Sequence, residues 1–159
     1  MNVVLTTIIV GIGATLAIDI WVIFLKLFNI ESLDYKYSGR WVGSIPKGKF
    51  LHNKIFNTPQ IRYEAEIGWF AHYLIGITFA CLLVVVYGKN WLDNPTLLPA
   101  IIIGIITVAA PFLILQPVLG FGFASSKLPK PNIRRLKSLM THTIYGFGLY
   151  LTALLLKQL

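Results

Sequence analysis

Four polar side chains lie inside long apolar stretches of the sequence and are its best candidates for chemistry: Asp19, His72, Gln116 and His142. A charged carboxylate in the middle of a membrane helix costs roughly 2.5–3.5 kcal/mol on insertion scales, so such residues are functional by default. A carboxyl group binds and releases protons, and an imidazole changes its charge near neutral pH. We expect the four side chains to meet at an intramembrane polar site that handles a proton or a small solute.

The two histidines allow a second interpretation. His72 and His142 each lie about one turn inside the predicted cytoplasmic end of a helix, so their imidazoles lie at similar depth. Imidazole is the commonest metal ligand, and two such rings would suit a b-type haem, or a metal ion with Asp19 as a third ligand. A third interpretation is a non-catalytic structural or partner-binding protein, in which the polar groups only fix helix packing.

Catalytic templates are incomplete in this sequence. It contains neither His-Glu-x-x-His nor Gly-x-Ser-x-Gly, and its single cysteine, Cys81, allows no cysteine pair. Ser138 and His142 share a predicted helical face, but a triad would also need Asp19, and chance readily supplies such spacing. The sequence therefore favours a protein that is not an enzyme.

The elements that must position these side chains follow from hydropathy. Of the 159 residues, 56% are hydrophobic and only 13% are charged, whereas a soluble domain has about a quarter charged residues. A membrane-spanning helix needs about 20 predominantly apolar residues, and four stretches qualify. They are about 3–28, 67–87, 97–119 and 139–156. The sequence predicts one transmembrane domain over 1–159, an all-α four-helix bundle.

The orientation follows from the basic residues, which give a net charge of +8. Lysine and arginine concentrate in the loops at about 29–66 and 120–138, and cytoplasmic loops carry such an excess. Both loops are therefore predicted to be cytoplasmic, with the polar site facing the cytoplasm and both chain ends facing out. We expect anionic lipid headgroups to bind these loops, and the candidate contacts are Arg40, Lys47, Lys49, Arg134 and Arg135.

The same loops show no recognition helix or base-stacking motif, so we do not expect a nucleic-acid partner. Four helices are few for a transport protein, which favours a homo-oligomer.

A faint internal repeat relates the two halves of the chain. The stretch 8–12 (IIVGI) resembles 101–105 (IIIGI), and 72–76 (HYLIG) resembles 142–146 (HTIYG). Each half would then be one helical hairpin, related to the other by an axis along the membrane normal. Apolar helices are built from few residue types and often resemble one another by chance, which is the competing explanation.

The third predicted helix contains Pro111 and Pro117. Each proline lacks a backbone donor and frees the carbonyl four residues earlier, which usually kinks a helix. Irregular backbone of this kind is tolerated in a membrane where it is packed in protein or lines a cavity. We therefore expect a kink close to Gln116.

Several motifs are distributed along nearly the whole chain. They are Gly13-Ala14-Thr15-Leu16 with Asp19 and Trp21; Gly39-Arg40-Trp41-Val42-Gly43 with Pro46, Gly48, Phe50 and His52; Gly68-Trp69 with His72-Tyr73 and Gly76; Thr107-Val108-Ala109-Ala110-Pro111-Phe112 with Gln116-Pro117; and Ser138-Leu139 with Thr141-His142. Together they resemble a bacterial family of small membrane proteins described as domain of unknown function 2938. The resemblance implies a bacterial inner-membrane protein with several spans, with no activity or cofactor attached.

Overall fold

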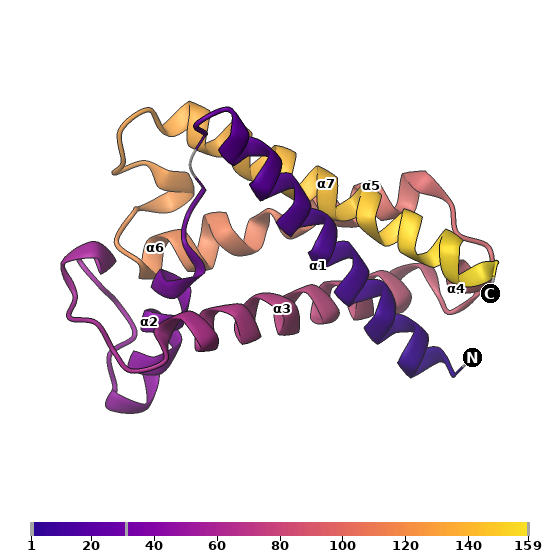
Figure 1. Cartoon of the computed structure of the whole chain (residues 1–159), viewed down its shortest axis with the longest axis horizontal. Helices are drawn as coiled ribbons and strands as arrows, with labels where there is room; N and C mark the ends of the chain where they lie inside the picture. The colour runs from indigo at the N-terminus through magenta and orange to yellow at the C-terminus, as the bar shows by residue number, and fades with distance from the viewer. Residues whose placement is uncertain (1, 31, 159) are drawn as a thin grey trace. The chain divides into compact units, whose positions relative to one another are not determined.

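The computed structural model describes residues 2–30 and 32–158, and within them it contains helices and no strand (Figure 1). This confirms the all-α prediction. Four helical segments in this part of the chain are long and apolar enough to cross a membrane. They are α1 (Val3–Leu27), α3 (Glu64–Tyr87), the segment Leu97–Val118 and α7 (Pro131–Lys157). The four-helix membrane bundle predicted from hydropathy is therefore confirmed.

Shorter elements connect and interrupt these segments. The α-helical ones are α2 (Tyr35–Ser44), α4 (Asn90–Asp93), α5 (Leu97–Thr107) and α6 (Gln116–Val118). The others are the 3₁₀ turns η1 (Ile45–Lys47), η2 (Ile55–Asn57) and η4 (Phe123–Ser125), and the π-helical segment η3 (Pro111–Leu115).

The last helix begins earlier than its apolar stretch. The predicted span starts near residue 139, whereas α7 begins at Pro131. Hydropathy marks only where the apolar residues begin. The lysine and arginine residues before that point are good helix formers, so the same helix extends over them. Proline is favoured at a first helical position because its missing N–H would have no partner there.

Contacts between Cα atoms divide the chain into two compact units. Unit 1 comprises Met1–Ser32, Tyr73–Thr107 and Leu139–Leu159, and unit 2 comprises Leu33–His72 and Val108–Ser138. Unit 1 thus contains α1, α4, α5 and the greater parts of α3 and α7. Unit 2 contains α2, the two long connecting segments, the first residues of α3 and α7, and the interrupted end of the third span.

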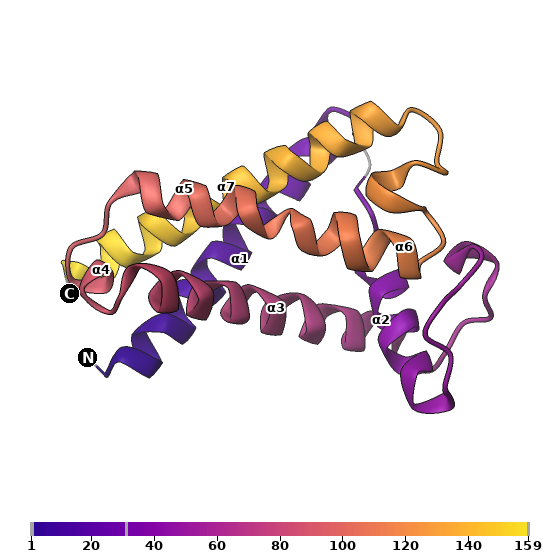
Figure 2. The same cartoon turned by 180° about the vertical axis from the view of Figure 1, so that it is seen from behind.

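The helices of unit 1 pack closely because small residues line their contacts. A Cβ atom added to Gly11 would lie 2.6 Å from the Cα of Ile77 in α3, and one added to Gly148 would lie 2.7 Å from the Cα of Ala14 in α1. Small residues allow the close backbone approach typical of membrane helices. Figure 2 shows α5 running beside α7 in the same unit. The buried core of unit 1 includes Val10, Ile18, Leu83, Trp91, Ile103, Tyr145 and Leu149.

The internal repeat has a structural counterpart in unit 1. Gly11 and Gly76, from the first two spans, both lie at the contact between α1 and α3. Their sequence matches, Gly104 and Gly146, lie at the contact between α5 and α7, where a Cβ on Gly104 would be 2.9 Å from the Cα of Gly146. Each predicted hairpin therefore uses its matched glycine pair to bring its two helices together.

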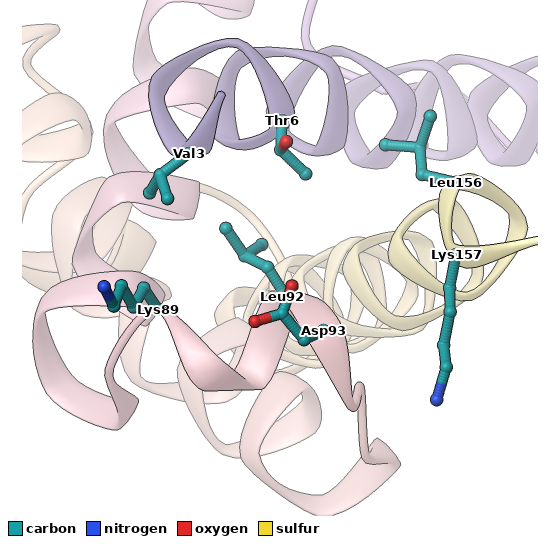
Figure 3. A pocket seen from close by; sticks show the side chains of 7 residues that line it. All are labelled: Val3, Thr6, Lys89, Leu92, Asp93, Leu156 and Lys157. Atoms are coloured by element: carbon teal, nitrogen blue, oxygen red, sulfur yellow. The ribbon is translucent and has the colours of Figure 1, made fainter. Parts of the chain in front are cut away.

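One end of unit 1 gathers both ends of the described chain. The first turn of α1, the helix α4 and the last turn of α7 surround a pocket of about 230 Å³ (Figure 3). Lys157 in α7 also donates a hydrogen bond of 3.0 Å to Asn94 beside α4. Both chain ends and the loop after α3 thus lie at one end of this unit, as four spans require.

Unit 2 holds its first long loop in place. A Cβ on Gly39 of α2 would lie 2.5 Å from the backbone nitrogen of Gly68, which fixes α2 against the start of α3. The amide of His52 donates to the carbonyl of Val118 at 2.9 Å, and that of Ile55 donates to Leu119 at 3.0 Å. The buried residues of this unit include Ile55, Leu119 and Phe121.

The prolines of the third span produce a π-helical segment. The π-helix η3 begins at Pro111, and the amide of Gln116 donates to the carbonyl of Pro111. A proline cannot donate to the preceding turn, and the wider π turn absorbs the resulting change in register. The predicted irregularity next to Gln116 is present, as a π-helix.

Candidate functional site

Asp19 has a partner on the neighbouring helix of unit 1. Its side chain is buried, with 9% of its surface exposed. The Tyr73 hydroxyl in α3 donates a hydrogen bond of 2.7 Å to the Asp19 carboxylate. Asp19 lies eight residues before the end of α1, or roughly 12 Å along the helix axis. The pair therefore lies well inside a segment that is long and apolar enough to span a membrane.

The backbone around this pair is fixed by small residues and one tyrosine. Thr15, one turn before the carboxylate, donates its hydroxyl to the carbonyl of Gly11 at 2.8 Å. Gly76 in α3 lies against the Thr15 side chain, and a Cβ there would overlap the Thr15 hydroxyl. Tyr145 in α7 donates to the Gly76 carbonyl at 2.6 Å. Contacts among α1, α3 and α7 therefore fix the backbone that carries Asp19 and Tyr73.

His142 is bonded to the third span within unit 1. Its Nδ1 lies 2.9 Å from the Thr107 hydroxyl, which donates its only proton to the Gly104 carbonyl at 2.6 Å. The threonine oxygen is then the acceptor, so Nδ1 of His142 carries a proton and donates it. In the neutral ring Nε2 is left as the acceptor.

His72 and Gln116 belong to unit 2. The imidazole of His72 stacks on the Tyr35 ring, with centroids 4.0 Å apart. The Gln116 amide nitrogen lies 3.5 Å from the Ser138 hydroxyl, a long hydrogen bond. Its Oε1 is buried without a hydrogen-bond partner among the described residues. Each of the four predicted site residues thus has a contact of its own, and their convergence remains a prediction.

The interpretation of His72 and His142 as haem or metal ligands can be compared with where the candidate ligand side chains lie. No group of three or more His, Cys, Asp or Glu side chains in residues 2–30 and 32–158 is arranged to hold a metal ion. Within unit 1, Asp19 and His142 are each bonded to a protein hydroxyl. That His72 and His142 hold a haem or a metal stays a prediction.

Arg40 is placed differently from the other basic residues. It is 3% exposed, and its guanidinium forms a bidentate ion pair with Glu64, with both hydrogen bonds at 2.8 Å. It also donates to the carbonyls of Ile55 at 3.1 Å and Thr58 at 2.7 Å. The hydrogen bond to Glu64 raises the pKa of Arg40. Four of its five N–H groups are thus bonded inside the protein, so Arg40 is less available to a lipid headgroup than the exposed bases. That it contacts a headgroup stays a prediction.

The other four predicted contacts lie in the connecting segments of unit 2 or in the first turns of α7. Lys47 and Lys49 are exposed. Arg134 is exposed and donates to the carbonyl of Pro129 at 3.0 Å. Arg135 is half-buried and donates to the carbonyl of Ala124 at 2.9 Å. Lys47 and Lys49 are therefore the two best placed to meet an anion from solution or from a lipid surface.

His52 is a buried imidazole that hydropathy does not single out. It is 5% exposed, and its Nδ1 lies 2.9 Å from the Thr58 hydroxyl. Burial, reinforced by the positive charges of Lys49 and Arg40, lowers the pKa of His52 below its ordinary value of 6.5. His52 is therefore neutral near pH 7.

This shift predicts an acid-sensitive contribution to stability. The unfolded chain protonates His52 near its ordinary pKa of 6.5, while the folded chain binds the proton only at lower pH. The unfolded state then binds more protons, so the free energy of unfolding should fall as the pH is lowered from about 7.5 to about 5.5. Denaturant titrations in detergent should show a smaller fall for His52→Gln. Equal pH dependence of the two proteins would contradict this assignment.

Fold and site together define a small polytopic membrane protein with a carboxyl–phenol pair inside one span and a fixed, basic connecting segment. The family described as Protein of unknown function (DUF2938) matches residues 8–156, so the chain belongs to that family. The resemblance drawn from the sequence motifs is thereby confirmed. No curated protein and no solved structure matches the chain.

Tyr73, Glu64 and Thr107 are the partners that sequence reasoning missed. Tyr73 follows His72 directly and belongs to one of the motifs given above, so it could have been considered as a partner of Asp19. Glu64 pairs with an arginine 24 residues earlier, which hydropathy does not reveal. A search for opposite charges at the ends of neighbouring predicted elements would have found it.

Proposed function

We propose that this protein handles protons, or a small solute whose movement is coupled to them, at an intramembrane polar site centred on Asp19. The observation that carries the proposal is the buried Asp19 carboxylate accepting the Tyr73 hydroxyl at 2.7 Å within two membrane-competent helices. Ionisable groups inside a membrane are costly and typically mark proton or ion pathways.

The pair has the chemistry to exchange a proton. The structure has the Tyr73 hydroxyl donating to Asp19, which is the direction that a carboxylate requires. A carboxylic acid at the same position could instead donate its own O–H to the Tyr73 oxygen, and the tyrosine proton would then turn to another acceptor. Protonation thus reverses the direction of one hydrogen bond. The wider proposed site adds His142, His72 and Gln116, which supply further groups able to accept a proton or contact a solute.

The setting is also part of the proposal. We place the protein in the bacterial inner membrane with both ends outside and the basic loops in the cytoplasm, following the distribution of lysine and arginine. Lys47, Lys49, Arg134 and Arg135 would then face anionic headgroups. Four helices are a small number with which to enclose a transport pathway, so we propose that the pathway is completed by self-association of the chain.

The test is proton movement in proteoliposomes. A pH-sensitive dye inside the vesicles reports acidification after an external acid pulse, for the wild-type protein and for Asp19→Asn. We expect a protein-dependent flux that Asp19→Asn reduces to the level of empty vesicles. Tyr73→Phe, which keeps the ring and removes the hydroxyl, should lower the rate by about 10²-fold or more, as expected for loss of a positioned proton-transfer group.

Glu66→Gln provides the matched control, since it makes the same carboxyl-to-amide change at an exposed position of α3. Its flux should equal that of the wild type. An Asp19→Asn protein that folds and conducts like the wild type would reject the proposal and favour a structural role for the pair.

A further inference from the structure

A second polar site lies in unit 2, apart from the residues used above for proton handling. The loop that follows η1 forms a pocket of about 580 Å³. Its lining carries two lysines and two asparagines and no acidic side chain. The polar lining residues are Lys49, His52, Asn53, Lys54, Asn57 and Thr58.

No acidic side chain within residues 2–30 and 32–158 forms an ion pair with the lysines of this pocket. Both lysines, Lys49 and Lys54, are exposed. The nearby Arg40 is paired with Glu64. The two lysines are therefore available to an anion, and the two asparagine amides are neutral donors beside them.

His52 supplies a buried polar atom that lacks a partner. Its Nδ1 is engaged with Thr58, but its Nε2 is buried and has no hydrogen-bond partner in residues 2–30 and 32–158. Leaving a buried polar group unsatisfied typically costs about 1–3 kcal/mol, so such an atom in a pocket lining calls for an explanation. With Nε2 protonated, the ring would donate to an anion's oxygen.

The pocket backbone is held in place by other parts of unit 2. Two carbonyls of the lining segment and its flank, those of Ile55 and Thr58, accept from Arg40. The left-handed Gly120, with φ of +83°, lies so close to the Asn53 carbonyl that a Cβ there would overlap it. A loop held from two sides loses little further entropy on binding a ligand, which favours affinity.

From these observations we infer that the pocket of residues 49–59 binds a phosphate-bearing anion, with Lys49 and Lys54 supplying charge and His52, Asn53 and Asn57 supplying hydrogen bonds. Phosphate suits this set because its oxygens accept several hydrogen bonds while its charge meets the two ammonium groups. The same chemistry is presented by free phosphate and by the headgroup of an anionic phospholipid.

The first experiment uses the three histidines of the chain as reporters. The full-length protein in neutral detergent, labelled with ¹⁵N at histidine, is titrated with inorganic phosphate while the imidazole resonances are followed by NMR. The resonances of His52, assigned by their loss in His52→Gln, should shift and saturate. Those of His72 and His142 should not move.

The second experiment separates the two sources of phosphate. Isothermal titration calorimetry measures inorganic phosphate binding in detergent, and native mass spectrometry measures retained lipid from nanodiscs of phosphatidylglycerol or phosphatidylcholine. The double variant Lys49→Ala/Lys54→Ala should weaken the binding of whichever of the two ligands the pocket takes, phosphate or phosphatidylglycerol, roughly tenfold or more. Arg62→Ala, which removes an exposed base of the same loop outside the lining, should bind as the wild type does.

Saturable binding of phosphate with a shift at His52 assigns a soluble ligand. Selective retention of phosphatidylglycerol that depends on Lys49 and Lys54 assigns a lipid headgroup. Binding of neither phosphate nor phosphatidylglycerol, or an equal loss in the double variant and Arg62→Ala, would overturn the inference.

Discussion

Replacing Arg40 with methionine is expected to lower the free energy of unfolding by about 3–5 kcal/mol, which is the range for breaking a buried ion pair from one side. The substitution removes the bidentate partner of Glu64 and two hydrogen bonds to backbone carbonyls. It leaves a carboxylate that is only 11% exposed without its counter-charge. The packing of α2 and the loop of residues 49–59 should loosen first, because Arg40 bonds to both α3 and this loop.

The measurement is denaturant unfolding in detergent, combined with proteolysis of the connecting loop. Lys36→Met is the matched control, because Lys36 pairs with Asp34 at a surface where both side chains are more than a third exposed. Such pairs contribute about 0–1 kcal/mol. The double variant Arg40→Met/Glu64→Met should recover part of the loss. A change for Arg40→Met no larger than for Lys36→Met would contradict the buried ion pair.

Gly146→Ala is expected to destabilise the bundle by about 1–3 kcal/mol, as overpacking of a close contact does. An added Cβ would lie 2.7 Å from the Ala100 carbonyl oxygen and 2.9 Å from the Ile101 Cα, both backbone atoms of α5. In an unconstrained helix the same change stabilises by roughly 0.5–1 kcal/mol, because alanine is the better helix former. The sign of the effect therefore reports the contact between α5 and α7.

Unfolding of the wild type, Gly146→Ala and Gly43→Ala should be compared under one set of conditions. Gly43 lies in α2, where an added Cβ would meet first the terminal methyl of the Ile61 side chain, which can move aside. We expect Gly43→Ala to be close to neutral. Stabilisation by Gly146→Ala would show that α5 and α7 are farther apart than the structure has them.

The spans could be predicted from the sequence because burial in lipid depends on composition alone. Four apolar runs of sufficient length give four helices, whatever their contacts. The start of α7 could not be predicted in this way, since residues 131–138 are polar yet helical. The π-helix at Pro111 could be predicted only as an irregularity, because several backbone geometries absorb a missing donor.

The candidate site was predictable in its ionisable residues and not in their partners. Asp19 stands out because a carboxylate in an apolar helix is costly wherever it points. Its bond to Tyr73 joins residues 54 positions apart, and it depends on how α1 and α3 pack, which composition does not determine. Arg40 could likewise be recognised from the sequence as a basic loop residue, but not as the partner of Glu64 at the start of α3, 24 residues later.

Proton-induced infrared difference spectroscopy detects directly whether Asp19 takes up and releases a proton. Films of the reconstituted protein are exchanged between a neutral and an acidic buffer, and the carboxylic acid C=O region is compared among variants. We expect a band on acidification that is missing in Asp19→Asn, displaced in Tyr73→Phe and unchanged in Glu66→Gln. Identical wild-type and Asp19→Asn spectra in this region would contradict this expectation, since Asp19 would then keep one protonation state and serve only to join α1 to α3.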